Sequence, residues 1–504
     1  MRRGLVAKAA PLDPKRSENG PVAKDLRQFI SKLKRDYPED LVEITRLIRP
    51  GDFEVTALLE HLELRQLFPA VHFLTPANGH GDSSEFSLIS NVFGTRERCA
   101  TALDFPREQA KMPLSIEFAR RERMSVPAEI VAFGVAPVKA RVARGEAVDI
   151  GVLPIVRHHE MDLSPVLTMT LVMRDPDDGF YDITFVKAFP QGPRRVGVAI
   201  HSPHLERILG KYEARGRRAP MAIVLGHHPA FYLGSLSLSP FGTNDYDAVG
   251  GFLGEPLRLV ASETWGEDFL VPADAEIVVE GEILPGERAI VNPFGEVTRH
   301  YQAQCLRPVA ELTALTHRER AIMQDVFSGH QGHWNLGGIP KEGSLYNVLN
   351  QRFGGVRAVH LPYSGCSRFS CYISMEKREE GMAKMLGMEA LTQTKLMEVV
   401  IIVDEDIDPF VEPDVLWAVL TRTNLRQDVT VIHNVQSFFF SAMGGSKVII
   451  DATRPLDAAF PEKIKVPQDV LDRMKLEEWL GDGSEASSGA GIGDSYKEGG
   501  PDGA

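Results

Sequence analysis

The sequence is poor in cysteine and has no excess of positive charge. Its 504 residues include four cysteines, too few for a disulfide framework, and no two form the CxxC pair of a zinc or redox site. The net charge of -13 gives no general attraction for nucleic acid or an anionic membrane, which leaves only local basic pockets. No stretch reaches the roughly 18 apolar residues of a spanning helix, and the N-terminus lacks the apolar segment of a secretory signal. We therefore expect a soluble protein of the reducing cytoplasm.

Familiar catalytic motifs are missing as well. The sequence contains no P-loop, no GxSxG, no HExxH, and no GxGxxG that opens a helix after a strand. This argues against simple NTPase, hydrolase and dinucleotide-binding functions.

With 43% hydrophobic and 25% charged residues, the composition is that of a globular protein. A length of 504 residues indicates more than one domain. Apolar spacing predicts an early helix with Leu26, Phe29, Ile30 and Leu33 on one face, which Tyr37 and Pro38 end. A second amphipathic helix is predicted at residues 202–216. Short β-rich runs dominate the first two thirds, at residues 166–173, 183–189, 195–200, 221–226, 257–262 and 276–284. They predict a mixed sheet or barrel.

The pattern changes after about residue 340. Predicted helices at residues 380–391 and 412–424 alternate with buried strands at residues 399–403, 429–435 and 447–451. This alternation predicts a second domain of the α/β class.

Several polar groups could carry chemistry. The H-x-x-H pairs His201/His204 and His330/His333 could bind a metal with Asp182 and Asp245 as oxygen partners, but packed or surface histidines show the same spacing. The acidic string Asp404-Glu405-Asp406-Ile407-Asp408 follows an apolar strand, where it could hold a divalent cation or be a solvated loop. The spacing alone leaves these alternatives open, with the structural one favoured in each case.

The segment NPFGEVTRHY combines Pro293, which fixes φ, with Gly295, which permits a tight turn. Such a turn could present Glu296 into a cleft. A simple hairpin turn with an exposed glutamate is the favoured interpretation from this segment alone.

The order of segments resembles the UbiD family of decarboxylases of aromatic and heteroaromatic acids. The resemblance rests on VFGTRERCATAL (92–103), DITFVKAF (182–189), VGVAIHSPHLERIL (196–209), MAIVLGHHPAFYL (221–233), EIVVEGEILPGERAIVNPFGEVTRHY (276–301), VVIIVDEDIDP (399–409), VLWAVLTR (415–422) and KVIIDATRP (447–455). It implies an α+β and α/β multidomain fold, with a split β-barrel flavin-binding domain and a C-terminal α/β oligomerisation domain.

With the resemblance, the chain divides into six expected parts. These are a flexible leader (1–20), a prenylated-FMN-binding domain with an N-terminal α/β portion (21–310), a connecting helix or linker (311–340), the oligomerisation domain (341–465), a C-terminal helix (466–480) and a disordered tail (481–504). A UbiX-type flavin prenyltransferase is expected to supply the cofactor, and the chain is expected to form a dimer or hexamer.

The resemblance also implies a cofactor site in which a divalent metal, usually Mn²⁺, holds the phosphate of prenylated FMN, with K⁺ nearby. The family's metal-binding Asn, His and Glu fall on Asp182, His204 and Asp245, which carry one more negative charge as a set. Thr184 and Lys187 are further expected contacts of the cofactor.

The family's catalytic Glu-Arg-Glu set is altered in this chain. The second Glu is Glu296, but the first is Val291 and the Arg is Lys187. Lysine is a point charge, whereas arginine offers a planar fork to a carboxylate. We expect an active, divergent member in which Lys187 orients the substrate carboxylate and Glu296 is the general acid/base, with apolar walls from Val291 and Phe294.

The expected reaction is the reversible, non-oxidative decarboxylation of an aromatic acid through a covalent adduct with prenylated FMN. The residues expected to line the substrate pocket are Val291, His330, His333, Trp334 and Leu336. The leading substrates are heteroaromatic or polycyclic acids of the indole-, pyrrole-, furan- or phenazine-carboxylate type. Alternatives are a hydroxybenzoate-type acid, an aromatic acyl-CoA with a free carboxylate, or a non-catalytic flavin-binding partner subunit.

Overall fold

The computed structural model describes residues 23–438, 444–475 and 478–479. The expected leader (1–20) and disordered tail (481–504) lie outside these residues. Two compact units cover the chain, Met1–Thr453 and Arg454–Ala504, and the second contributes helix α11 (Gln468–Arg473). All features below belong to the first unit.

The predicted helices form where apolar periodicity meets a cap. Helix α1 spans Leu26–Asp36 and buries the four predicted apolar residues, while the Asp25 side chain accepts a hydrogen bond from Gln28 N at its start. Helix α5 spans Pro203–Glu213, with Ser202 as its N-cap and Pro203 at its first position. Both helices predicted in the first two thirds of the chain are thus confirmed.

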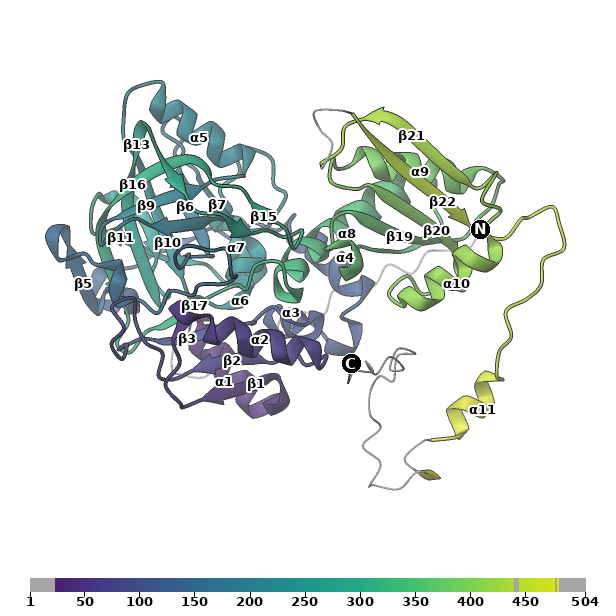
Figure 1. Cartoon of the computed structure of the whole chain (residues 1–504), viewed down its shortest axis with the longest axis horizontal. Helices are drawn as coiled ribbons and strands as arrows, with labels where there is room; N and C mark the ends of the chain where they lie inside the picture. Colours follow the sequence, from purple (N-terminus) through teal and green to yellow (C-terminus); the bar gives the residue numbers. More distant parts are fainter. Residues whose placement is uncertain (1–22, 439–443, 476–477, 480–504) are drawn as a thin grey trace, which may run out of the picture. The chain divides into compact units, whose positions relative to one another are not determined.

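The N-terminal part contains a four-stranded sheet in the order β1-β2-β3-β17, so that β17 lies beside β3 although the whole central sheet separates them in the sequence (Figure 1). Its strands are β1 (Leu41–Ile44), β2 (Ala70–Phe73), β3 (Ser87–Ser90) and β17 (Ile322–Gln324). The helices of this part are α1, α2 (Glu54–Leu64), α3 (Arg96–Ala102) and α4 (Met112–Arg121).

The central part is a large sheet whose strands follow the order β7-β6-β10-β13-β16-β9-β8, with β5 paired to β16. The strands are β5 (Arg141–Arg144), β6 (Thr170–Arg174), β7 (Tyr181–Phe185), β8 (Lys187–Pro190), β9 (Arg195–Ala199), β10 (Ala219–Leu225), β13 (Ile277–Val291) and β16 (Cys305–His317). The helices of this part are α5, α6 (Pro229–Gly234) and α7 (Asp245–Leu253). Its smaller strands are β4 (Glu129–Ile130), β11 (Arg258–Ser262), β12 (Gly266–Pro272), β14 (Phe294–Gly295) and β15 (Tyr301–Gln302).

The two end strands of this sheet, β7 and β8, are separated in the chain by Val186 alone. A sheet whose opposite ends are joined by one residue must curl until those ends meet. Val186 N donates to Met169 O (2.9 Å), and an antiparallel bridge pairs Leu167 with Ala188 across the seam. The curled sheet has the barrel-like form that the resemblance implies for this domain.

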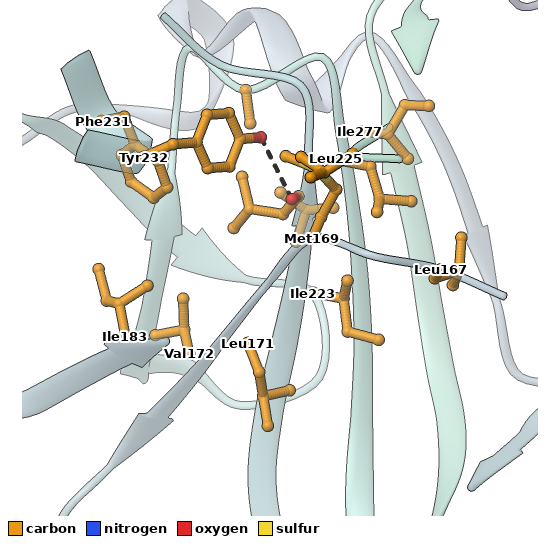
Figure 2. Close-up of a cluster of buried hydrophobic side chains, with 14 of the residues drawn as sticks. Leu167, Met169, Leu171, Val172, Ile183, Ile223, Leu225, Phe231, Tyr232 and Ile277 are labelled. Carbon is orange, nitrogen blue, oxygen red and sulfur yellow. Dashed lines mark hydrogen bonds between the residues drawn. The ribbon is translucent and has the colours of Figure 1, made fainter. Parts of the chain in front are cut away.

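Apolar side chains fill this domain. Figure 2 shows Leu171, Ile223 and Ile277 among the buried residues, next to Tyr232. The Tyr232 hydroxyl donates to Val224 O (3.3 Å) and accepts from Gly226 N (2.7 Å), so its polar end is satisfied inside the core (Figure 2).

The C-terminal part follows helix α8 (Gln331–Phe353) and has a five-stranded sheet in the order β18-β19-β20-β22-β21. Its strands are β18 (Val356–His360), β19 (Ser370–Met375), β20 (Val399–Asp404), β21 (Val429–Val435) and β22 (Gly445–Ala452), and its helices are α9 (Met382–Thr392) and α10 (Glu412–Arg422). The predicted α/β alternation is confirmed, and with it the expected fold class. The expected domain boundaries stay a prediction.

The acidic string after β20 is used for ion pairs. Asp404 and Asp406 both contact Arg422 of α10, at 2.7 and 2.8 Å, and Asp408 contacts Lys111 (2.6 Å). Because arginine and lysine side chains pair with these carboxylates, the acidic string has a structural role.

Helix α8 packs closely on α4 at Gly343. A Cβ added to Gly343 would lie 1.9 Å from the backbone oxygen of Ser115, which cannot move aside as a flexible side chain can. The absence of a side chain at Gly343 therefore sets how closely the two helices approach.

We predict that Gly343→Ala lowers the free energy of unfolding by about 3 kcal/mol, because it forces α4 and α8 apart. The matched control is Gly210→Ala in α5, where nothing lies within 4 Å of the added Cβ and stability should rise by about 0.5–1 kcal/mol. Urea unfolding of the three proteins measures both effects. Equal effects of the two substitutions would contradict the close packing of α4 on α8.

Candidate active site

The seam of the curled sheet brings two of the predicted metal-binding residues, Asp182 and His204, into contact. Asp182 lies on β7 and His204 lies in the first turn of α5, and His204 Nδ1 is 3.0 Å from Asp182 Oδ2. Thr184 lies two residues beyond Asp182, on the same face of the strand.

Asp245 is placed beside Asp182 by the start of α7. The N-cap residue Asn244 accepts a hydrogen bond from Tyr181 N (3.1 Å), and Asp245 Oδ2 accepts one from Ile183 N (2.8 Å). The helix start is thus tied to the backbone on both sides of Asp182.

Burial dominates the electrostatics of this group. Burial raises the pKa of Asp182, and the neighbouring His204 opposes that shift. Burial, reinforced by the charge of Asp182, raises the pKa of Asp245 well above its ordinary value. Neither carboxyl has an ion pair with lysine or arginine in the described part of the chain. Asp182, His204 and Asp245 are therefore suited to bind a cation, and no lysine or arginine among the described residues takes that place.

The side chains of Asp182, His204 and Asp245 do not surround one common point in this structure. Within the described ranges, no three His, Cys, Asp or Glu side chains are arranged as a ready metal site. His204 contacts Asp182 directly, while Asp245 contacts the backbone. The metal-binding role of the three residues stays a prediction.

The predicted acid/base residue lies on a hairpin, as the local sequence favoured. Phe294 of β14 pairs with Gln302 of β15, and Glu296 begins the turn, with its N–H donating to His300 O (2.9 Å). Gly295 is required there because an added Cβ would lie 2.4 Å from the ring of His159.

The Glu296 carboxylate is not a solvated surface group, however. Lys187 Nζ of β8 lies 3.0 Å from Glu296 Oε2, and His201 Nε2 lies 3.9 Å from Glu296 Oε1. The Gln302 amide lies between Glu296 and Arg307, and in the amide orientation that satisfies both neighbours its nitrogen donates to Glu296 Oε1 (3.2 Å) and its oxygen accepts from Arg307. The fold thus joins the two predicted catalytic residues, and adds His201 and Gln302, which were not predicted as their neighbours.

Lys187 lies over an aromatic ring in a largely apolar surrounding. Its ammonium nitrogen is 4.6 Å from the centre of the Phe294 ring. Burial lowers the pKa of Lys187, and the charge of Glu296 opposes that shift. Val291 is 1% exposed and packs with Phe294 and Phe189 in a small apolar cluster. Val291 therefore supports the ring under Lys187.

The predicted pocket residues of α8 divide into two groups. His333 keeps part of its surface accessible, and burial together with the charges of Lys187 and Arg368 lowers its pKa well below the ordinary value. His330 stacks on Phe327 at 3.5 Å and pairs with Glu63 (2.7 Å). His333 is thus a neutral imidazole close to the Lys187–Glu296 pair, whereas His330 is engaged with Glu63.

Trp334 and Leu336 contribute to packing. Leu336 is 3% exposed within the main core, and Trp334 Nε1 donates to Val297 O (2.9 Å), next to Glu296. Trp334 therefore holds the turn that carries Glu296, the predicted acid/base residue, a role that its aromatic ring alone did not predict.

Arg368 was not predicted from the sequence. It lies on the segment between β18 and β19, and its charge acts on Lys187 and His333. No local pattern marks it, because its place in the site depends on packing of that segment against α8.

Three family models match the chain in order, and all carry the description 3-octaprenyl-4-hydroxybenzoate carboxy-lyase. Its N-terminal domain matches residues 33–111, its Rift-related domain residues 129–331, and its C-terminal domain residues 334–452.

Individual relatives cover nearly the whole chain. A phenolic acid decarboxylase of Streptomyces sp. (strain D7) is 30% identical over 90% of this chain and 97% of its own length. An anhydromevalonate phosphate decarboxylase of Methanothermobacter thermautotrophicus is 30% identical over 75% of this chain and 87% of its own length. Among solved structures, an evolved dimeric form of the UbiD-class enzyme HmfF from Pelotomaculum thermopropionicum, in complex with prFMN, superposes with a TM-score of 0.81. It is 33% identical and covers 91% of this chain and 100% of that one.

We predict that Trp334→Phe lowers the free energy of unfolding by about 1 kcal/mol more than Trp265→Phe does. The first change removes the hydrogen bond to Val297 O as well as ring area, whereas Trp265 packs on Phe269 and has no indole hydrogen bond in the described part of the chain. Thermal unfolding of both variants measures the difference. Equal losses would show that the bond to Val297 does not hold the turn.

Proposed function

Since this chain belongs to the UbiD family of carboxy-lyases, we propose that it decarboxylates an aromatic acid with prenylated FMN as cofactor. The leading substrates are heteroaromatic or polycyclic acids of the indole-, pyrrole-, furan- or phenazine-carboxylate type. The observation that carries the proposal is the contact of 3.0 Å between Lys187 and Glu296 at the seam of the barrel. A non-catalytic subunit would not need this pair, whose members come from distant segments and stay partly accessible.

Lys187 binds the carboxylate that is lost. Its ammonium group lies at 12% side-chain exposure, where a charge interaction is stronger than in water. A substrate carboxylate competes with Glu296 for the ammonium group, and this competition frees the Glu296 carboxyl. The contact seen between the two residues is thus the resting state of the site.

Glu296 moves the proton. When bound, the prenylated flavin supplies an electrophilic carbon for the substrate carbon that carries the carboxylate. Once Lys187 has turned to the substrate carboxylate, Glu296 takes up a proton from solvent. The bond to CO2 breaks, its electron pair stays on the carbon, and Glu296 delivers the proton to that carbon, which forms the C–H bond of the product. Gln302 and the turn held by Trp334 keep the Glu296 carboxyl in place for this transfer.

Asp182, His204 and Asp245 hold a divalent metal, with Mn²⁺ as the expected ion and K⁺ nearby. Two adjacent buried carboxyl groups without a lysine or arginine partner support this assignment. The metal would neutralise these carboxyls and bind the phosphate of the cofactor, since a buried phosphate needs a counter-charge.

A hydroxybenzoate-type acid is the second candidate substrate. The phenolic acid decarboxylase that is 30% identical favours it. Because Nδ1 of the neutral His333 imidazole accepts from Gly329 N (3.2 Å), its Nε2–H could donate a hydrogen bond to a phenolic oxygen. A homo-oligomer and a UbiX-type supplier of the cofactor complete the proposal.

We predict that Glu296→Gln abolishes decarboxylation and the exchange of solvent deuterium into product, by about 100-fold or more, because the amide cannot deliver a proton. Flavin content, measured by absorbance and mass after co-expression with a flavin prenyltransferase, should stay unchanged. Glu287→Gln is the matched control, since Glu287 of β13 is a partly exposed glutamate that also pairs with a cation, Arg195. Unchanged turnover in Glu296→Gln would remove Glu296 from this role. A wild-type holoprotein that exchanges neither CO2 nor deuterium with a panel of aromatic acids would refute the proposed enzyme.

We predict that Asp245→Asn raises the stability of the metal-free protein but removes its stabilisation by Mn²⁺. The substitution relieves the repulsion between two buried carboxyls and deletes a metal ligand. In the wild type, Mn²⁺ at about 100 times its Kd should add about 2.7 kcal/mol. Thermal shift with and without Mn²⁺, and metal content by mass spectrometry, measure this, with the exposed Asp268→Asn as control. Full stabilisation of Asp245→Asn by Mn²⁺ would contradict the ligand role.

A further inference from the structure

His201 lies between solvent and the Glu296 carboxylate. It is the first member of an H-x-x-H pair whose second member, His204, contacts Asp182 instead. The His201 side chain is 54% exposed, and its Nε2 lies 3.9 Å from Glu296 Oε1. Glu296 itself is only 25% exposed. The imidazole thus reaches from open solvent to the less accessible carboxylate that is proposed to deliver the proton.

The backbone around His201 sets where the imidazole emerges. Ala199 of β9 pairs with Lys187 of β8, and His201 follows Ala199 by two residues, so it lies just beyond the cross-strand neighbour of Lys187. Ser202 then caps α5, because its hydroxyl oxygen accepts a hydrogen bond from Leu205 N (3.4 Å). The chain turns from strand to helix directly after His201, and this turn keeps His201 on the Glu296 side of the seam.

The proposed reaction consumes one proton in each turnover, because a carboxylate leaves as neutral CO2 and a C–H bond takes its place. In the resting state the Glu296 carboxylate is paired with the Lys187 ammonium group at 3.0 Å. Glu296 must therefore take up a proton from outside the site after Lys187 has turned to the substrate.

Three side chains lie beside the Glu296 carboxylate, namely Lys187, His201 and Gln302. The Lys187 ammonium group is engaged by the substrate carboxylate when the proton is needed, and the amide of Gln302 does not ionise. An imidazole, by contrast, changes its charge near neutral pH and has two ring nitrogens that exchange protons. Of these three side chains, His201 is therefore the one that can bring a proton from solvent.

The charges around His201 suit this exchange. Partial burial lowers the pKa of His201, and the charge of Glu296 opposes that shift. Among the other charged groups that face it, Arg307 and Lys187 lower the pKa and Glu206 raises it. A lower pKa makes the imidazolium a stronger acid toward Glu296. The separation of 3.9 Å is closed by a small rotation of the exposed ring or by one bridging water.

We propose that His201 carries protons between solvent and Glu296. A ring nitrogen of His201 takes a proton from water or buffer, Nε2–H gives a proton to Glu296 Oε1, and Glu296 gives it to the carbon that CO2 leaves. The imidazole returns to its neutral form, and no electron is transferred. This inference rests on the proposed function, in which Glu296 is the acid/base residue. His201 acts through Glu296 and is not itself required to touch the substrate.

The test compares the holoenzyme with His201→Gln, His201→Ala and the control His80→Gln. His80 is a matched histidine, 49% exposed and 2.9 Å from Asp149 Oδ2. The substrate is the acid that the wild type turns over fastest in the panel of aromatic acids. For each protein, kcat, KM, flavin content and the uptake of solvent deuterium into the product are measured at several buffer concentrations. The measurements are repeated with imidazole and with pyrazole, a ring of equal size that is not protonated near neutral pH.

Both His201 variants should lower kcat and deuterium uptake by about 10-fold to 100-fold. KM and flavin content should stay unchanged, because Lys187 still binds the substrate. The remaining rate should rise with buffer concentration, which the rate of the wild type should not do. Imidazole should restore most of the loss in His201→Ala, whereas pyrazole should not. The control should match the wild type.

A titration followed by NMR tests the contact without turnover. In protein with isotope-labelled histidine, the signal that is missing from His201→Gln identifies His201. Glu296→Gln should lower the pKa of His201, because the substitution removes the negative charge beside the ring. His80→Gln should leave that pKa unchanged.

Three results would overturn the inference. These are wild-type rates in both His201 variants, a loss in His201→Ala that imidazole does not restore, and a His201 pKa that does not respond to Glu296→Gln. The second result would give His201 a positioning role only. Failure of the proposed function has a different signature, since the wild type would then exchange deuterium with none of the acids, and the proton path would be refuted with it.

Discussion

Strands β7 and β8 lie at the two ends of the central sheet, yet one residue, Val186, separates them in the chain. The sheet between them has to curl until its edges meet, and the bridge between Leu167 and Ala188 joins the seam. Asp182 and Lys187 lie on the two strands of this seam. The closure of the sheet therefore places in one neighbourhood the Asp182 carboxyl and the Lys187 ammonium group, which are proposed to serve the cofactor and the substrate.

The other site elements are attached to this seam by backbone contacts. Helix α7 is anchored on both sides of Asp182, which sets Asp245 beside it. The β14–β15 hairpin carries Glu296 to Lys187, and Trp334 of α8 holds the hairpin through Val297 O. The attachments of α7 and α8 each end on a main-chain atom, at Tyr181 N, Ile183 N and Val297 O, whereas Glu296 and Lys187 meet through their side chains.

Charge pairing separates structural residues from those of the site. Glu342 is enclosed by Arg96, Ser115 and His360, and these partners hold its pKa at about 2 although it is buried. At the site, by contrast, Asp182 and Asp245 have no lysine or arginine partner in the described residues. The molecule pairs the charges that support its fold and also pairs Lys187 with Glu296, but among the described residues it gives Asp182 and Asp245 no such cation.

The sequence by itself determined the local elements and their order, because apolar periodicity and turn residues act over a few positions. It predicted α1, α5, the β-rich runs and the hairpin at Gly295, and the order of segments pointed to the family. Tertiary structure decided what the polar groups contact. Glu296 faces Lys187 instead of solvent, Asp404 faces Arg422, and Arg368 joins the site. These contacts join distant segments, and they depend on how curled sheets and helices pack, which no local pattern encodes.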